Sequence, residues 1–313
     1  MKQNHIIIGL LCGILGVFCL TGCDKADGIG DWTFEYPAPI FENTELGQLR
    51  KELYETYKVN FTPEFDDKFY EFDWNNEFDL FETQTIPEAD QSYTISYLKE
   101  VKAVLQQMPT FLIERLPSHV ILVDSLRNPY NIRYNYQTVS ESVHGIMGYN
   151  ITNFLVFSYA GKSFPLQDKN ELRETWTELF FERALSDYEA PEAFKELVAK
   201  QSAGSTKGYS LTGVWRTYQT MTSYGFLEDS YLRRNKINYG DIDNKGKIIS
   251  LIYHLQMTEI QDLALFIGFT MYRPQAGKKE MYALSDVFAQ KEELVKKFCS
   301  NTLGFELKPI VNQ

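Results

Sequence analysis

The spacing of hydrophobic positions predicts two amphipathic helices early in the chain. Apolar side chains recur every three or four residues over residues 45–59 and again over residues 92–105, with charged residues between them. This spacing collects the apolar side chains on one face of a helix. Pro109 and Pro117 bracket the segment that follows the second helix.

Two short runs rich in Val, Ile and Phe predict strands. HVILVDSL occupies residues 119–126, and ITNFLVFSYA occupies residues 151–160. Apolar runs of this length are typical of buried strands, so we expect both to lie in one sheet. The Asn, Pro, Tyr and Gly residues between the two runs favour loops or an edge hairpin.

An acidic segment, residues 64–82, carries eight acidic side chains against the single Lys68, with Phe and Tyr interleaved. We interpret this segment as an exposed edge strand and loop with a solvated acidic face. The alternative is a calcium site, but the Gly and the ligand spacing of an EF-hand are missing.

After Pro165 the pattern becomes mainly helical. The predicted helices cover residues 168–187, 191–200, 245–267 and 287–299. The third is apolar on most faces, so we expect it in the core. Strands that precede helices in this way indicate an α+β fold, with a small mixed sheet in the N-terminal half followed by a mainly helical second half.

Composition and charge exclude one class of function. With 313 residues, 44% of them hydrophobic and 15% aromatic, the chain is long enough to bury a sizeable core. Its formal net charge is -11, which repels phosphate backbones and anionic headgroups. Nucleic-acid binding through a general basic surface is therefore excluded.

The amino terminus has the pattern of a targeting segment. Lys2 precedes an apolar run over residues 6–20, which suits a signal peptide and is short for a membrane span. The run ends in Leu-Thr-Gly-Cys, a pattern that looks like a bacterial lipobox, so we expect cleavage before Cys23 and lipid on its thiol. The alternative is an ordinary secretory signal in which Cys23 is incidental. We expect a signal peptide over residues 1–22, a lipid-anchored tether over 23–40 and a single domain over 41–313.

Cysteine usage agrees with an anchor. Cys12 and Cys19 leave with the signal peptide, Cys23 carries lipid such as palmitate, and Cys299 remains alone. Lipid chains on one Cys bind a membrane without a spanning helix. The acidic start of the tether is compatible with a surface-exposed outer-membrane lipoprotein.

The order of these segments resembles a known family. The pieces are the lipobox, the early helix, Asn60-Phe61-x-Pro63, PSHVILVDS, ITNFLVFSY, KEELVKKF and FELKPI. Together they resemble the zinc-binding metallopeptidase lipoproteins, also called substrate import-associated zinc metallohydrolase lipoproteins. The resemblance covers most of the mature chain. It implies a gluzincin-like peptidase domain beside a TonB-dependent outer-membrane importer.

The resemblance also implies a zinc site, from which this sequence departs. The family carries H-E-x-x-H on a helix after the second strand, where two His one turn apart bind Zn²⁺ and the Glu polarises a metal-bound water. The equivalent residues are Thr177-Glu178-Leu179-Phe180-Phe181. Glu178 remains as a vestigial general base. Thr177 and Phe181 stand at the former metal-ligand positions, and neither is a useful zinc ligand.

The third ligand of the family lies in an E-D-F-A-E-like segment of a later helix. We place that segment at residues 243–247, which puts Lys247 where a carboxylate is expected. In this register the sequence predicts no metal cofactor, and zinc only if other ligands exist.

Other chemistry finds weaker support. His119, His144 and His254 form no pair at helical spacing, and His254 and Glu259 fall on different faces of the predicted third helix. Residues 174, 178 and 182 are all Glu and share one helix face, for which we favour a solvated acidic stripe over a carboxylate metal site. No G-x-S-x-G, phosphate loop or dinucleotide fingerprint is present, and Cys299 has no nearby His.

Three functions remain. The first is an envelope lipoprotein with a metallopeptidase-like domain that has lost zinc and catalysis, in an accessory or binding role near a TonB-dependent importer. The second is an active zinc peptidase with non-standard ligands. The third is a surface lipoprotein that captures glycans or peptides on exposed aromatic rings.

Overall fold

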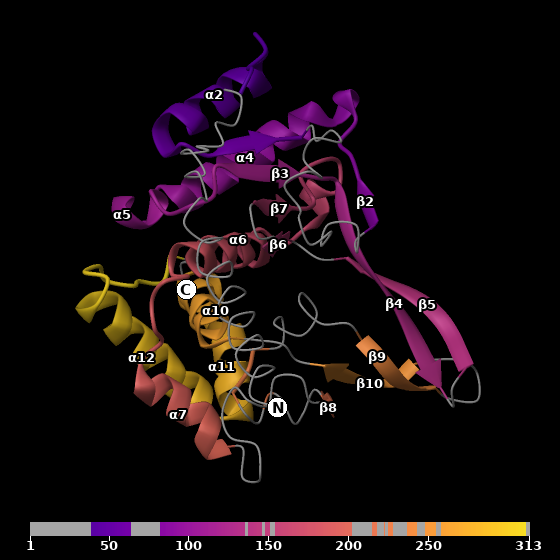
Figure 1. Ribbon diagram of the computed structural model, residues 1–313, viewed down its shortest axis with the longest axis vertical. Helices are drawn as coiled ribbons and strands as arrows, with labels where there is room; N and C mark the ends of the chain where they lie inside the picture. The colour runs from indigo at the N-terminus through magenta and orange to yellow at the C-terminus, as the bar shows by residue number, and fades with distance from the viewer. Residues whose placement is uncertain are drawn as a thin grey trace, which may run out of the picture. The chain divides into compact units, whose positions relative to one another are not determined.

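The chain divides into two compact units, Met1–Ile40 and Phe41–Gln313, and the elements below belong to the second unit. The computed structural model describes residues 39–63, 82–134, 137–145, 148–150, 154–201, 215–217, 222, 225–227, 237–242, 248–254 and 258–310. Cys23, Lys247 and the acidic segment up to Phe81 lie outside these residues. Figure 1 shows the arrangement of the helices and strands.

A four-stranded sheet lies in the first half of the unit. Its order is β1 (Asn60–Thr62), β3 (His119–Leu122), β7 (Leu155–Phe157) and β6 (Gly148–Asn150). The first three strands are parallel, and β6 is antiparallel to β7. Every residue of β1, β3 and β7 is buried. The prediction that residues 119–126 and 151–160 supply buried strands of one sheet is confirmed for His119–Leu122 and Leu155–Phe157, whereas Ser125 and Leu126 belong to a second sheet.

Two helices pack beside this sheet, over residues for which the hydrophobic spacing predicts helices. They are α2 (Glu45–Tyr57) and α4 (Gln91–Leu105), which contact each other, and α2 also contacts β1. α2 begins at Thr44, whose side-chain oxygen accepts a hydrogen bond from the Gly47 N–H at 3.1 Å. It ends at Lys58 in the left-handed conformation, with φ 60°.

A second sheet of six strands extends from the first half into the second. The strands are β2 (Glu82–Gln84), β4 (Ser125–Tyr134), β5 (Gln137–Gly145), β8 (Trp215–Thr217), β9 (Ile237–Ile242) and β10 (Ile248–His254). The order is β2-β4-β9-β10-β8, and β5 pairs with β4. β4 and β5 form the hairpin expected between the two buried strands and extend away from the first sheet (Figure 1).

The helix predicted over residues 245–267 is wrong over residues 248–254, although residues 259–267 are helical. Residues 248–254 form strand β10, and helix α10 (Glu259–Tyr272) starts only after Thr258. A short apolar run does not by its period distinguish a buried helix from a buried strand, and three isoleucines at 248, 249 and 252 favour the strand. Thr258 and Gln261 form a capping box, which sets the start of α10. The described part of the second half therefore contains the strands β8, β9 and β10 besides its helices.

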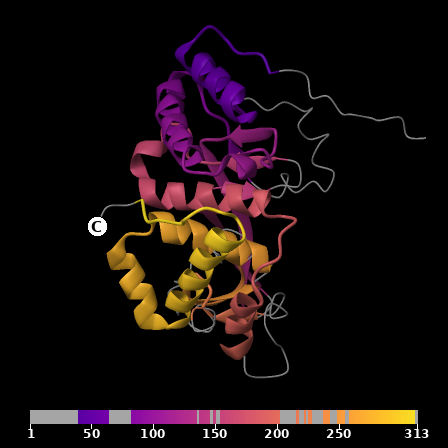
Figure 2. The same cartoon turned by 90° about the vertical axis from the view of Figure 1, so that its left-hand side faces the viewer.

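Five helices make up most of the described remainder of the second half. They are α6 (Lys169–Ala184), α7 (Glu192–Gln201), α10, α11 (Gln275–Leu284) and α12 (Val287–Asn301). The helices predicted over residues 168–187, 191–200 and 287–299 are confirmed. α11 is an addition, because Gly277 in its interior weakens the sequence signal. Figure 2 shows α6 between the layer of α2 and α4 and the layer of α10, α11 and α12.

One hydrophobic core joins the first sheet to the helices on both sides. Trp176 of α6 lies near its centre, where its indole N–H donates to the Tyr97 hydroxyl at 2.8 Å. That hydroxyl donates in turn to the Ser158 carbonyl at 3.0 Å. Both polar tips are thereby satisfied inside the core. Among the described helices, none has the length and apolar character that a membrane span requires.

Candidate functional site

Helix α6 carries the residues that the sequence singles out, and it is buried on nearly every side. Eleven of its 16 residues are buried, far more than one face of a surface helix provides. α6 packs closely against α10 and also contacts α4, α5 and β6. It begins at Asp168, whose carboxylate accepts from the N–H groups of Asn170 and Glu171 at 2.7 and 3.2 Å.

The two positions where the resemblance expects histidine are core positions. Thr177 and Phe181 are both 0% exposed. The Phe181 ring lies 6.0 Å from that of Phe305, which follows the last helix. Burial raises the pKa of the Tyr272 phenol to about 12, although Arg173 and the nearby Thr177 hydroxyl lower it. Neutral or apolar groups therefore occupy the place expected for metal ligands.

Glu178 stays in the interior as well. Its exposed fraction is 1%, and it interacts with other groups of the chain. A general base of a zinc hydrolase must reach a water molecule that enters from solvent. A carboxylate held inside a helix layer is not presented in that way.

The solvated acidic stripe predicted for α6 is wrong. Glu174 is 1% exposed and Glu182 is 8% exposed. The Arg273 guanidinium donates twice to Glu174, from Nε at 2.8 Å and from Nη2 at 2.7 Å. Gln261 Nε2 donates to Glu182 Oε1 at 2.7 Å. Because this face of α6 packs on α10, its carboxylates bind partners on that helix and its C-terminal cap.

The backbones of α6 and α10 come into close contact at Gly268. A Cβ atom on Gly268 of α10 would lie 2.5 Å from the Glu174 carbonyl oxygen. Only glycine permits helices to approach this closely. The interface is therefore a tightly packed helix pair at this position.

Lys247, the residue placed at the third former ligand position, lies outside the described residues. The helix expected around it is not observed, because residues 248–254 form strand β10. The later helix that packs on α6 is α10.

Thr177 and Phe181 do not fit zinc. The Thr hydroxyl is not ionised at neutral pH, and the Phe side chain has no lone pair to donate. Within the described ranges, His, Cys, Asp and Glu side chains form no group of three that could hold a metal ion.

The histidines are spread over separate strands. His119 belongs to β3, is 8% exposed, and its Nδ1 lies 2.9 Å from the Ser118 hydroxyl oxygen. Burial lowers the pKa of His119. His144 belongs to β5 and His254 to β10. His254 and Glu259 therefore share no helix, which corrects the placement of both on one helix.

Cys299 is a core side chain. It is fully buried in α12, and burial raises the pKa of its thiol to about 12. Because the thiolate is the nucleophile, a buried neutral thiol is inert.

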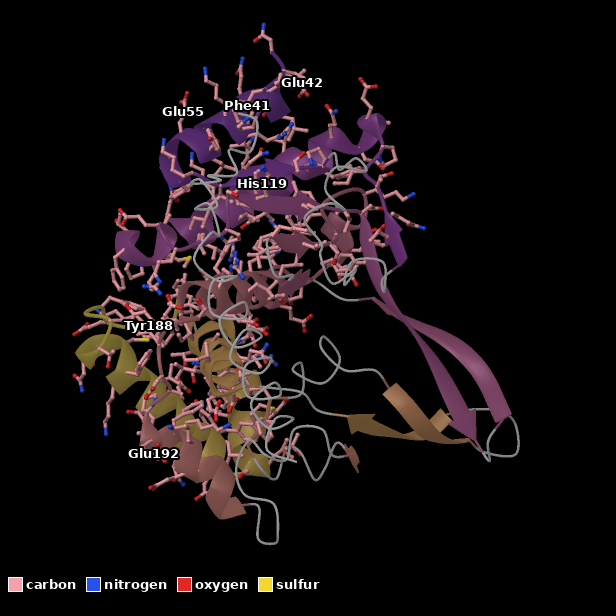
Figure 3. All side chains as sticks on the ribbon, in the orientation of Figure 1. Phe41, Glu42, Glu55, His119, Tyr188 and Glu192 are labelled. Atoms are coloured by element: carbon pink, nitrogen blue, oxygen red, sulfur yellow. The ribbon has the colours of Figure 1, made fainter. Side chains whose placement is uncertain are left out.

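A cavity of about 320 Å³ lies elsewhere, between the starts of α2 and α4. It is lined by Glu42, Thr44, Pro63, Ile86, Glu88 and Gln91. No residue of α6 or α10 lines it, and Figure 3 labels Glu42 near the start of α2. The cavity is therefore distinct from Thr177 and Phe181, the positions where the resemblance expects metal ligands.

No protein-family model matches this chain, and no curated protein matches it. A solved structure that is similar comes from Bacteroides caccae and is described as a "putative zinc-binding metallo-peptidase". The identity is 11%, the match covers 86% of this chain and 91% of the other, and the TM-score is 0.46. Similarity at this level decides neither the family nor the activity of this chain.

Proposed function

We propose that the mature chain is an envelope lipoprotein whose metallopeptidase-like domain has lost zinc and catalysis. In this proposal Cys23 carries the lipid, and the domain acts as an accessory or binding protein beside a TonB-dependent nutrient importer. The sequence resemblance supports the gluzincin-like domain and the importer. The Leu-Thr-Gly-Cys pattern supports the anchor and the outer-membrane location.

The burial of Phe181 is the observation that carries the proposed loss of zinc. A catalytic zinc site needs lone-pair ligands on one helix face and an open coordination position that water can enter. Phe181 instead places a ring in the core, and Thr177 one turn earlier is buried with it. The face that would hold the metal contributes to folding.

Glu178, Glu174 and Glu182 then serve the fold instead of a reaction. Glu174 binds Arg273 through two hydrogen bonds, and Glu182 binds Gln261. These contacts fix α6 against α10 and Arg273, its C-terminal cap. Truncating one partner of such a buried charged contact leaves the other group without compensation.

No specific observation favours capture of glycans or peptides on aromatic rings. Among the residues whose side chains the structure describes, the exposed rings are Tyr93 of α4, at 38%, and Phe111 of α5, at 40%. Trp176 is 1% exposed. Most described rings therefore serve the core.

Hydrolysis of a generic protein substrate tests the proposal. We expect the purified mature chain to show no hydrolysis that a zinc chelator abolishes, and Glu178→Gln to change nothing. The matched control is Glu55→Gln on the exposed side of α2, labelled in Figure 3. Circular dichroism would confirm that both variants fold. Chelator-sensitive hydrolysis that Glu178→Gln removes and Glu55→Gln leaves would establish the active-peptidase alternative.

A further inference from the structure

Lys291 of α12 and Asp262 of α10 form an ion pair in the interior of the helical region. Both side chains are 0% exposed, and Lys291 Nζ lies 2.5 Å from Asp262 Oδ2. The two helices contact each other (Figure 1), so packed helices fix the positions of both groups. A nitrogen that is nucleophilic when neutral is therefore held against a carboxyl group.

The surroundings of the Lys291 amine are almost entirely apolar. The distances from Lys291 Nζ to the ring centroids are 5.0 Å for Phe194, 4.8 Å for Phe226 and 5.0 Å for Phe266. The carbonyl of Gly225 accepts a hydrogen bond from the same nitrogen at 2.8 Å. These groups leave the side chain no exposure to water.

Such a dry site favours the neutral forms of the two reacting groups. Burial lowers the pKa of Lys291 more than the Asp262 carboxylate raises it. The ring faces attract the ammonium, but transfer of its proton to Asp262 removes two buried charges at once. The product of that transfer is an amine in contact with a carboxylic acid.

A second buried ion pair differs at this point. Lys278 Nζ of α11 lies 3.0 Å from Glu292 Oε1 of α12. Glu292 also accepts a hydrogen bond from the Tyr282 hydroxyl and lies 3.2 Å from Lys296 Nζ. Burial raises the pKa of Glu292, but these donors outweigh that effect and keep it below the usual value. Glu292 therefore stays ionised, and an ionised carboxylate does not react with an amine.

We propose that an isopeptide bond joins Lys291 Nζ to Asp262 Cγ in the mature protein. The nitrogen attacks Cγ, a new N–C bond forms, and the bond from Cγ to one carboxyl oxygen breaks. That oxygen leaves as water with the acid proton and one proton from the nitrogen. The step needs no oxidant, reductant or co-reactant, and fixed contact between the groups replaces a high concentration of either.

The bond would cross-link α10 to α12. In the proposed mature chain Cys299 is the one cysteine without lipid, so no intramolecular disulfide can form. An isopeptide bond would restrict the unfolded chain as a disulfide does. This inference does not depend on the loss of zinc or on the envelope role.

Mass spectrometry of the full mature chain tests the bond. We expect the denatured protein to be lighter than its sequence by one water molecule, after allowance for the lipid. Trypsin should fail to cleave after Lys291, and tandem spectra should identify a branched peptide that joins Lys291 to Asp262. Full mass and cleavage after Lys291, even after several days at neutral pH, would overturn the proposal.

Paired variants assign the loss of mass to these residues. Lys291→Met/Asp262→Asn removes both reacting groups without leaving an unpaired buried charge, and we expect it to have its full mass. Lys278→Met/Glu292→Gln is the matched control at the other buried pair and should keep the loss. A loss that persists in Lys291→Met/Asp262→Asn would arise at another residue and would overturn the proposal. The branched peptide of the parent remains decisive if that variant fails to fold.

Discussion

Phe181 shows at the scale of one residue how a position expected to bind metal has become part of the core. Its side chain is 0% exposed and packs on Phe305. Replacing a fully buried Phe with Ala removes buried apolar area and leaves a cavity. The Phe181 side chain therefore stabilises the fold through the apolar area that it buries and the space that it fills in the core.

We expect Phe181→Ala to lower the free energy of unfolding by about 3–5 kcal/mol. The matched control is Phe111→Ala, whose ring is 40% exposed and should cost far less. Urea denaturation followed by circular dichroism measures both. A loss below about 1 kcal/mol for Phe181→Ala would mean that this position is not part of a packed core.

Glu292 gives the stability a dependence on pH. Burial raises the pKa of Glu292, but hydrogen bonds from Tyr282 and Lys278 outweigh that effect and the net pKa is below 4.5. The stabilisation from a lowered carboxyl pKa is present above pH 4.5 and is lost as the pH falls through the folded value. Glu292→Gln should therefore flatten the fall in stability below pH 4.5, whatever its effect at neutral pH.

Melting temperatures between pH 3 and 7, roughly the range in which carboxyl groups titrate, measure that slope. Glu293→Gln, at the exposed next position of α12, is the control and should keep the parental slope. An unchanged slope in Glu292→Gln would show that other carboxyl groups set the acid sensitivity.

At the scale of elements, the packing of α6 against α10 defines the centre of the molecule. Gly268 permits the two helices to touch, because a Cβ atom there would lie 2.5 Å from the Glu174 carbonyl oxygen. The backbone carbonyl of Glu174 cannot move aside as easily as the end of a flexible side chain can. A methyl group at this position must therefore push the helices apart.

Gly268→Ala should destabilise the chain by about 1–3 kcal/mol, the usual cost of overpacking. Gly277→Ala in α11 is the matched control, because its Cβ would meet only the Arg273 side chain, at 3.2 Å. There the better helix propensity of Ala should leave stability unchanged or raise it by about 0.5–1 kcal/mol. Equal effects of the two substitutions on urea midpoints would contradict close packing at Gly268.

Elements with a clear period were predictable from the sequence, and elements that depend on partners were not. The helix over Glu45–Tyr57 follows from its apolar spacing, whereas residues 248–254 form a strand that a short apolar run does not distinguish from a helix. The same limit applies to the site. The sequence places three Glu on one face of α6, but only the tertiary fold shows α10 covering that face. The acidic stripe was therefore wrong, and so was the helix expected after Lys247, where residues 248–254 form β10.

At the scale of the whole molecule, the proposed function requires an anchor at Cys23. The anchor predicts that the mature chain incorporates labelled palmitate and fractionates with the outer membrane. Cys23→Ser should abolish both, because the thiol is the atom that receives lipid. Cys19→Ser, four positions earlier, should change neither. If Cys23→Ser still incorporates palmitate, the lipid anchor at Cys23 is contradicted. The conclusions about helix α6 would not be affected.

Metal content tests the central claim most directly. The chain would be purified without a His-tag and without chelators, beginning after Cys23, and its zinc measured by mass spectrometry. We expect far less than one zinc per chain, because Thr177 and Phe181 supply no ionised or nitrogen ligand. One tightly bound zinc per chain would contradict the account, and the ligands would then have to be sought among His119, His144 and His254.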